Sequence, residues 1–256
     1  MKCTYHLALG YVRILLITLL VPACGRIGFD GLGPGALLGD ASGDGTGTNG
    51  DGPDATGSSA DCGSTLAFSD DFVATTRSAQ WLLTPNTGYT ISQGGGDLSV
   101  AFAATVGASL AAGYTESATV DLTGGCVIAR PDMLPNTSTS AYSYVVMANA
   151  ANTSGIGFEI QGGALKAIHY ENSSAAALVK QAPFDPVAHK VLRLREAVGI
   201  FYFDTSTDGA SFTTFTMIAD PLPPAALRME IGASTAGSSV NNGGTVLWGP
   251  VSILLP

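Results

Sequence analysis

Residues 189–217 read HKVLRLREAVGIFYFDTSTDGASFTTFTM, and this run predicts three consecutive β-strands. Residues 189–195 alternate, with Leu192 and Leu194 on one face and the basic residues on the other, which is the two-residue period of a strand covered on one side. Two further alternating runs follow, and the Asp-Gly pair at 208–209 separates them. Asp-Gly between apolar runs is a strong hairpin signal, because glycine takes the positive φ that tight turns require. The run therefore predicts a twisted antiparallel sheet with an apolar face and a polar face.

Short apolar runs that are broken by Gly, Asn, Ser and Pro recur throughout residues 63–256. The expected strands are 66–72, 79–83, 88–92, 97–103, 117–122, 126–129, 142–148, 157–161, 165–170, 189–195, 200–205, 211–217, 228–233 and 245–255. Many short strands with turn-rich connections predict an all-β fold, a two-sheet antiparallel jelly-roll sandwich. The alanine runs at 101–112 and 175–177 leave a helical turn open as an alternative.

The composition favours a β-rich exported domain over a helical cytosolic one. Of 256 residues only 12% are charged, while 33 are Gly and 13 are Pro. The formal net charge is −9, and an acidic surface repels nucleic acid unless basic residues are concentrated in a stripe. The densest basic group, Lys190, Arg193 and Arg195, is too small to track a nucleic-acid backbone. We therefore expect no nucleic-acid partner.

The amino terminus predicts an export signal over residues 1–23. Lys2, His6 and Arg13 precede an apolar segment, Ile14–Ala23. This segment is about half of the roughly 20 residues that a spanning helix needs, so we expect a signal peptide and not a membrane anchor helix.

The end of this segment, Leu20-Val-Pro-Ala-Cys24, resembles the lipobox of bacterial lipoproteins. The resemblance implies cleavage after Ala23, lipid on Cys24 and a stable membrane anchor, since that family carries several acyl chains. Residue 25 is Gly and not Asp, which by the same resemblance indicates the outer membrane or the cell surface within the cell envelope. The alternative is a soluble secreted protein in which Cys24 is a spare thiol.

Residues 24–62 are rich in Gly, Asp and Ser and predict a flexible tether that holds the domain at 63–256 away from the membrane. Five tether residues resemble a calcium loop of the EF-hand or dockerin type: Asp40, Ser42, Asp44, Gly45 and Asp51. The match is partial, because no helices flank it and the last ligand is Asp in place of Glu. We expect a plain linker and no cofactor, with calcium as the open alternative.

Two cysteines remain for the domain once Cys3 leaves with the signal peptide and Cys24 carries lipid. We expect Cys62 and Cys126 to form a disulfide, the default in an exported domain. In the chain-entropy model a loop of this length contributes about 4 kcal/mol. Two free thiols are the alternative.

Several segments, taken in order, resemble the concanavalin A-like lectin/glucanase domains, which include laminin G-like modules. The matching segments are Phe68-Ser-Asp-Asp-Phe72, Gln80-Trp81, Gly95-Gly-Asp-Leu98, 189–195, Ser206-Thr-Asp-Gly209 and Met229-Glu-Ile-Gly-Ala233. The resemblance implies two curved antiparallel sheets whose concave face and rim loops often take saccharides. Acidic residues hold calcium in some relatives, so Asp70 and Asp71 are candidates for this role, although capping of a strand end is the simpler interpretation.

Glucanases of that superfamily resemble one another in a strand with Glu-x-Asp-x-x-Glu, whose carboxylates act across the sugar bond. The glutamates of this chain lack a second carboxylate two residues on, as the pairs Glu159/Gln161, Glu171/Ser173 and Glu196/Val198 show. A Gly-x-Ser-x-Gly elbow is absent from the sequence, and His169 and His189 are too isolated to indicate a zinc site. We therefore expect that the protein is not an enzyme.

The expected ligand site lies on the polar face of the central hairpin. His189, Arg193, Arg195 and Tyr202 line this face, and guanidinium groups beside an aromatic ring suit a glycan ligand. The alternative is internal pairing of the arginines with Asp204 and stacking on Tyr202. Trp81 and Trp248 are either saccharide platforms or core residues.

The sequence thus predicts a surface-tethered lipoprotein whose lectin-like sandwich binds carbohydrate without catalysis. Two alternatives stay open. One is a polysaccharide hydrolase or lyase with acids from separate strands, and the other is a structural or adhesive envelope protein that contacts other proteins. The sequence names neither a particular ligand nor an oligomeric state.

Overall fold

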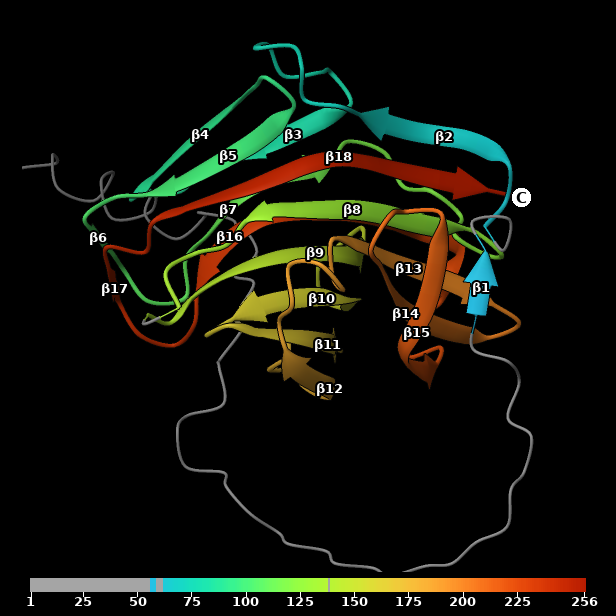
Figure 1. The fold of residues 1–256 in the computed structure, drawn as a ribbon. Helices are drawn as coiled ribbons and strands as arrows, with labels where there is room; N and C mark the ends of the chain where they lie inside the picture. The colour runs from blue at the N-terminus through green and yellow to red at the C-terminus, as the bar shows by residue number, and fades with distance from the viewer. Residues whose placement is uncertain (1–55, 59–61, 138) are drawn as a thin grey trace, which may run out of the picture.

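The computed structural model describes residues 56–58, 62–137 and 139–256 (Figure 1). The predictions for the signal peptide, for lipid on Cys24 and for the calcium-like pattern at 40–51 lie outside these residues. Within the described residues, no helix is long and apolar enough to cross a membrane.

The fold is an antiparallel β-sandwich, as predicted, and its larger sheet has nine strands in the order β1-β15-β14-β13-β8-β18-β5-β4, with β2 beside β18. The strands of this sheet are β1 (Thr56–Ser58), β2 (Thr65–Asp70), β4 (Tyr89–Gly94), β5 (Asp97–Phe102), β8 (Cys126–Met133), β13 (Val191–Ala197), β14 (Ile200–Ser206), β15 (Ser211–Ala219) and β18 (Thr245–Leu255).

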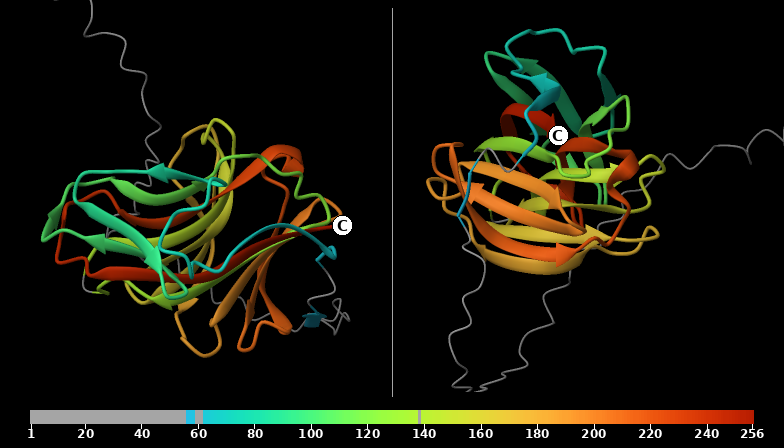
Figure 2. Two further views of the ribbon diagram at one scale, coloured as in Figure 1. Left: turned by 90° about the horizontal axis from the view of Figure 1, so that it is seen from above. Right: turned by 90° about the vertical axis from the view of Figure 1, so that its right-hand side faces the viewer.

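The smaller sheet has seven strands in the order β12-β11-β10-β9-β16-β7-β3. Its strands are β3 (Trp81–Thr84), β7 (Ala111–Glu116), β9 (Ala141–Asn149), β10 (Gly155–Gln161), β11 (Ala164–Tyr170), β12 (Ala177–Pro183) and β16 (Leu227–Thr235). A two-stranded ladder joins β6 (Thr105–Val106) to β17 (Val240–Asn241), and a short 3₁₀ helix, η2 (Pro224–Ala226), precedes β16. The two large sheets lie as separate layers when viewed from above and from the side (Figure 2).

The core fills the space between the two sheets. Phe158 of β10 meets Phe203 of β14 edge to face, with 5.2 Å between ring centroids. Trp248 of β18 donates its Nε1–H to the carbonyl of Gly232 on β16 at 3.0 Å. Trp81 is 1% exposed and Trp248 is fully buried, so both tryptophans are core residues.

The central hairpin has the predicted register. Arg193 lies opposite Asp204 and Arg195 lies opposite Tyr202 in the β13–β14 pair. Leu192 and Phe203 are buried in the core, as the alternation required. The strand begins at Val191, however, and the expected start at His189 is wrong because His189 belongs to a turn in which its N–H donates to Asp185 O.

Two further expectations need correction. The strand expected at 117–122 does not form, and only Val120 makes an isolated bridge, to Leu227. A strand forms earlier, as β7, which begins at the end of the first alanine run. Its small residues allow a close approach to β16: a Cβ on Gly113 would lie 2.1 Å from the carbonyl oxygen of Ile231. The second alanine run leads into strand β12 and not into a helical turn.

The predicted disulfide joins Cys62 to Cys126, 64 residues further along the chain. Cys126 begins β8, which has β13 on one side and β18 on the other. Of the segment expected to be a flexible tether, Thr56–Ser58 forms β1 and pairs with β15. The disulfide therefore fastens the start of the domain to an interior strand, beside the carboxyl terminus (Figure 1).

Candidate functional site

The outer face of the seven-stranded sheet, which points away from the core, carries tyrosines and ionisable side chains. Val145 and Met147 of β9 point into the core, so Tyr142, Tyr144 and Val146 point to the outer face. Residues directly opposed in an antiparallel pair point the same way. Glu159 lies opposite Tyr144 and Glu230 lies opposite Val146, so both glutamates are on this outer face.

Glu159 on β10 forms an ion pair with the neighbouring strand. Lys166 of β11 lies directly opposite it, and the Lys166 Nζ donates to Glu159 Oε1 at 2.8 Å. The same ammonium group contacts the side-chain oxygen of Gln161. Burial raises the pKa of Glu159, while the charge of Lys166 acts in the opposite direction. The ion pair favours the ionised carboxylate, the form that accepts a proton.

Glu230 on β16 has the more strongly shifted carboxyl group. Its side chain is 3% exposed, and Asn152 donates to its Oε2 at 3.3 Å. Asn152 in turn accepts a hydrogen bond from the Tyr170 hydroxyl at 2.8 Å. Burial raises the pKa of Glu230 to about 7, against the opposing charge of Arg228 at 3.9 Å. A carboxyl group with this pKa is protonated in a substantial fraction of molecules near neutral pH, so it can act as a general acid.

One strand, β9, separates the two glutamates. Their register partners on it, Tyr144 and Val146, are two residues apart. Neighbouring strands lie about 4.8 Å apart and two residues span about 7 Å, so the Cα atoms of Glu159 and Glu230 are about 12 Å apart. Tyr144 and Val146, which lie between them on β9, belong to a cluster of buried side chains on this face.

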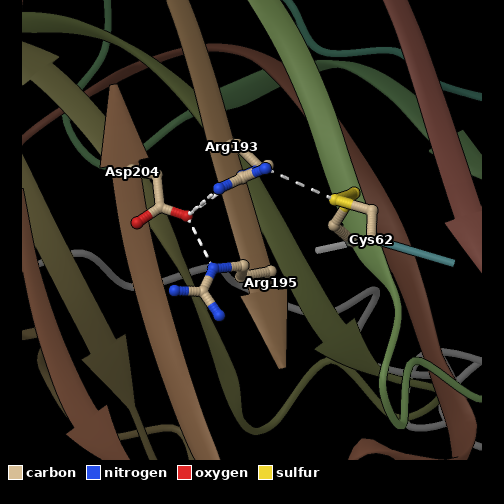
Figure 3. The surroundings of a disulfide bond; sticks show 5 residues. Cys62, Arg193, Arg195 and Asp204 are labelled. Atoms are coloured by element: carbon tan, nitrogen blue, oxygen red, sulfur yellow. Dashed lines mark hydrogen bonds and ion pairs between the residues drawn. A yellow bond between two sulfur atoms is a disulfide. The ribbon is translucent and has the colours of Figure 1, made fainter. Parts of the chain in front are cut away.

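Of the sequence-predicted ligand residues, Arg193, Arg195 and Tyr202 lie on the nine-stranded sheet, on the other side of the sandwich. Figure 3 shows the two arginines with Asp204 and Cys62. Arg193 is fully buried and contacts Asp204 Oδ2 through Nε at 3.0 Å and through Nη2 at 2.9 Å. Its guanidinium lies 4.0 Å from the centroid of the Phe212 ring and donates to Cys62 Sγ at 3.8 Å. This is the internal pairing that the sequence left open as the alternative.

Arg195 and Tyr202 belong to the same network. Arg195 Nε donates to Asp204 Oδ2 at 2.9 Å, and its guanidinium lies 3.8 Å from the centroid of the Tyr202 ring. The Arg195 side chain is 13% exposed. A glycan contact at this pair stays a prediction.

His189 is separate from that network. Its Nδ1 accepts the Asp185 N–H at 3.0 Å, and its ring packs on Phe184 and Phe215. Burial lowers the pKa of His189, which favours the neutral ring that accepts this hydrogen bond.

Asp70 and Asp71 cap the end of β2. Asp70 accepts the Phe72 N–H at 2.8 Å and the Trp81 Nε1–H at 2.8 Å, and Asp71 accepts the Val73 N–H at 3.1 Å. Among residues 56–58, 62–137 and 139–256, no group of three or more His, Cys, Asp or Glu side chains is placed to hold a metal ion.

Sequence reasoning considered Glu159 only for a partner on its own strand and did not consider Glu230 at all. Glu230 carries a local signal, because it alternates with the core residues Met229 and Ile231. Its relation to Glu159 depends on the strand order β10-β9-β16, which joins segments about 70 residues apart in sequence. A pattern within one strand does not contain that information.

No protein-family model matches this chain, and no curated protein matches it in sequence. Solved structures match its fold. A LamA variant from Z. galactanivorans in complex with laminaritriose and laminaritetraose is 15% identical, with a TM-score of 0.55 over 75% of this chain and 100% of that chain. A prokaryotic β-1,3-1,4-glucanase (lichenase) derived from a mouse hindgut metagenome is 12% identical, with a TM-score of 0.52 over 74% and 99%.

A third match is an immunostimulatory antigen and pseudo β-1,3-glucanase of Mycobacterium tuberculosis, at 11% identity and a TM-score of 0.52 over 75% of this chain and 99% of that one. These likenesses confirm the concanavalin A-like jelly-roll sandwich that the sequence motifs predicted. At such identities they show the fold alone.

The expectation of a binding protein without catalysis, and therefore not an enzyme, is contradicted. The matching structures are mainly polysaccharide hydrolases. The missing Glu-x-Asp-x-x-Glu strand is a weak ground for exclusion, because Glu159 and Glu230 share one sheet face although they come from separate strands. The alternative of a hydrolase with dispersed acids is the better supported one.

Proposed function

We propose that this protein is a glycan hydrolase in which Glu230 is the general acid and Glu159 the general base. The observation that carries the proposal is the pair of buried carboxyl groups with raised pKa values on one sheet face. The fold is shared with a LamA variant that holds laminari-oligosaccharides, which supports β-glucans as the first substrate class to test.

The proposed reaction uses each carboxyl group once. Glu230 gives its proton to the glycosidic oxygen as the bond from that oxygen to the anomeric carbon breaks and its electron pair moves to the oxygen. A water oxygen attacks the anomeric carbon, and Glu159 takes the proton that this water loses. The ammonium group of Lys166, at 2.8 Å, favours the ionised form of Glu159 and opposes the rise in pKa that burial causes. Glu230 is 2% exposed, so it is shielded from bulk water.

The test measures release of reducing ends from laminarin, mixed-linkage β-glucan and mucin glycans. We expect Glu230→Gln and Glu159→Gln each to lower the rate by about 100-fold or more, the usual contribution of a general acid or base. Glu171→Gln is the matched control, because Glu171 is an exposed carboxylate just after β11 with 48% of its side chain exposed, and we expect this variant to keep full activity.

Two results would count against the hydrolase. One is a folded wild-type protein that releases no reducing ends from any of these glycans. The other is an active protein whose rate is unchanged in both glutamine variants, which would place the reaction elsewhere.

We also propose that Cys24 carries the lipid that anchors the protein at the outer membrane or cell surface. The support is the lipobox-like Leu20-Val-Pro-Ala-Cys24. Detergent phase partitioning of wild-type and Cys24→Ser protein expressed with the full leader tests this. We expect the variant to move from the detergent phase to the aqueous phase, and equal partitioning of the two proteins would contradict the anchor.

A further inference from the structure

A pocket of about 570 Å³ opens on the outer side of the nine-stranded sheet. Strands β2, β8 and β18 form its base, and the segment that follows β2 forms one wall. Its volume lies in the range of about 300–1,000 Å³ that is typical of ligand pockets. Neither Glu159 nor Glu230 lines it, since both belong to the other sheet.

A β-bulge in β18 shapes this pocket. Trp248 lies opposite Pro131 and Val251 opposite Ala129, so Gly249 and Pro250 together oppose the single residue Arg130. A Cβ on Gly249 would lie 2.5 Å from Arg130 Nε, so glycine leaves the space that this guanidinium occupies. Bulges are over-represented beside binding sites, where they redirect side chains.

The segment after β2, which forms the wall, contains a residue with a strained backbone conformation. Phe72 has φ +51°, which is unusual for a bulky residue and costs about 1–2 kcal/mol. Its N–H donates to Asp70 Oδ1 at 2.8 Å, and its fully buried ring stacks on Trp81 at 6.2 Å between centroids. Such strain persists where the surroundings fix the backbone, so the wall is set before any ligand arrives.

The lining combines an aliphatic base with hydroxyl groups. The side chains of Ile128, Val191 and Pro250 supply the apolar surface. Ser69 and Ser252 face each other in the β2–β18 pair, and within the described part of the chain neither hydroxyl has a hydrogen-bond partner. Ser78 Oγ accepts the Gln80 N–H, which leaves its own proton to donate.

Most charged groups of the pocket form hydrogen bonds or ion pairs within the protein. Arg130 donates to Asp132 through Nε at 2.7 Å and through Nη2 at 2.6 Å, so the pair is neutral as a unit. Asp70 uses both oxygens within the fold, and Asp71 accepts one backbone N–H with its Oδ1. The remaining Asp71 charge disfavours anionic ligands, while the hydroxyls offer both donors and acceptors.

We propose that this pocket binds a neutral saccharide as a second glycan site, independent of the proposed hydrolytic site. The aliphatic base suits the C–H face of a sugar ring, and the serine hydroxyls and the free Asp71 oxygen suit its hydroxyl groups. A site on the far side of the sandwich holds a glycan without occupying the glutamates.

The test uses full-length protein with Glu159→Gln and Glu230→Gln, so that the probes stay intact. Laminari-, cello-, manno- and xylo-tetraose are titrated and the methyl NMR signals are followed, with tetragalacturonate as the anionic comparison. We expect at least one neutral probe to shift the methyl signals of Ile128 and Val191, and we expect no shift with the anion.

Ser252→Trp, which fills the pocket, is expected to weaken that binding at least tenfold. Ser92→Trp is the matched control, because Ser92 is an exposed residue of the same sheet outside the pocket lining, and it is expected to leave binding within twofold. The proposal is overturned if no neutral probe shifts these methyl groups, or if the shifts fall instead on Val146 and Ile168 of the other sheet. Neither outcome depends on whether wild-type protein hydrolyses glycans.

Discussion

At the scale of single residues, Asp204 is a buried charged group whose stability depends on its hydrogen-bond partners. It is fully buried and accepts hydrogen bonds from Arg193, Arg195 and Thr214. A carboxylate between two guanidinium groups satisfies charges that the interior would otherwise disfavour strongly. This network explains how the charged side chain of Arg193 can be buried beside the disulfide.

Asp204→Asn should therefore lower the free energy of unfolding by about 3–5 kcal/mol, because Arg193 stays buried without its counter-charge. Chemical denaturation measures the change. Asp121→Asn, at an exposed loop carboxylate, is the control and should cost less than about 1 kcal/mol. An Asp204→Asn protein as stable as the control would show that the ion pair contributes nothing.

Glu116 and Glu230 make stability depend on pH. Burial raises the pKa of each to about 7, above the ordinary value of 4.5. Below pH 4.5 both folded and unfolded states hold the proton, and between pH 4.5 and 7 the unfolded state loses it first. Stability is therefore fully present at low pH and falls as pH rises through this window.

We expect the free energy of unfolding to be lower at pH 8 than at pH 5, by up to about 3 kcal/mol for each of these groups. Glu116→Gln removes one titrating group, so the difference between its free energies of unfolding at pH 5 and at pH 8 should be smaller than that of wild type. Wild-type curves that coincide at the two pH values would rule out this linkage.

At the scale of strands, β9 sets the distance between the two proposed catalytic groups. Retaining glycosidases hold their carboxyl groups about 5–5.5 Å apart, whereas inverting enzymes leave about 6.5–9.5 Å for a water molecule. In the reaction proposed above, Glu159 activates a water molecule that attacks the anomeric carbon directly, which is the inverting mechanism.

The anomeric configuration of the first product should thus be inverted. Proton NMR during the first minutes of β-glucan hydrolysis distinguishes the two anomers before they equilibrate. A β-glucan should yield the α-anomer first. If the β-anomer appears first, the protein is a retaining hydrolase with a covalent intermediate, and the proposed role of Glu159 as a general base is wrong.

The strands also show how far sequence alone reaches. The central hairpin was predictable in register because Leu192, Phe203 and the Asp-Gly turn form a local pattern with a period of two. Strands β7 and β12 were not, because alanine has little strand preference and leaves a weak pattern. The pairing of Glu159 with Glu230 required the order of three strands, which depends on contacts distant in sequence.

At the scale of the whole molecule, the sandwich separates its two candidate sites by two sheets and the core between them. The glutamates lie on the outer face of the seven-stranded sheet, and the saccharide pocket lies on the outer side of the other. Stacked sheets are about 10 Å apart, so neither site shares a side chain with the other. Changes at one should leave the other intact.

The Cys62–Cys126 disulfide closes a long loop of this sandwich. Its removal by the double substitution Cys62→Ala/Cys126→Ala should cost about 4 kcal/mol in the chain-entropy model. Denaturant midpoints of wild type with and without reductant provide the measurement. Reductant should shift wild type toward the double variant and leave the double variant unchanged, and a wild type insensitive to full reduction would contradict the prediction.

The place of this bond also decides where mechanical force enters the domain. A pull on the chain ahead of Cys62, once it has separated β1 from β15, is transmitted through the disulfide to Cys126, at the start of a strand with hydrogen-bonded neighbours on both sides. The load therefore acts on the middle of the nine-stranded layer and cannot unzip β2 alone. Such a load meets the hydrogen bonds of β13 and β18 together, which a strand at the edge of the sheet would not provide.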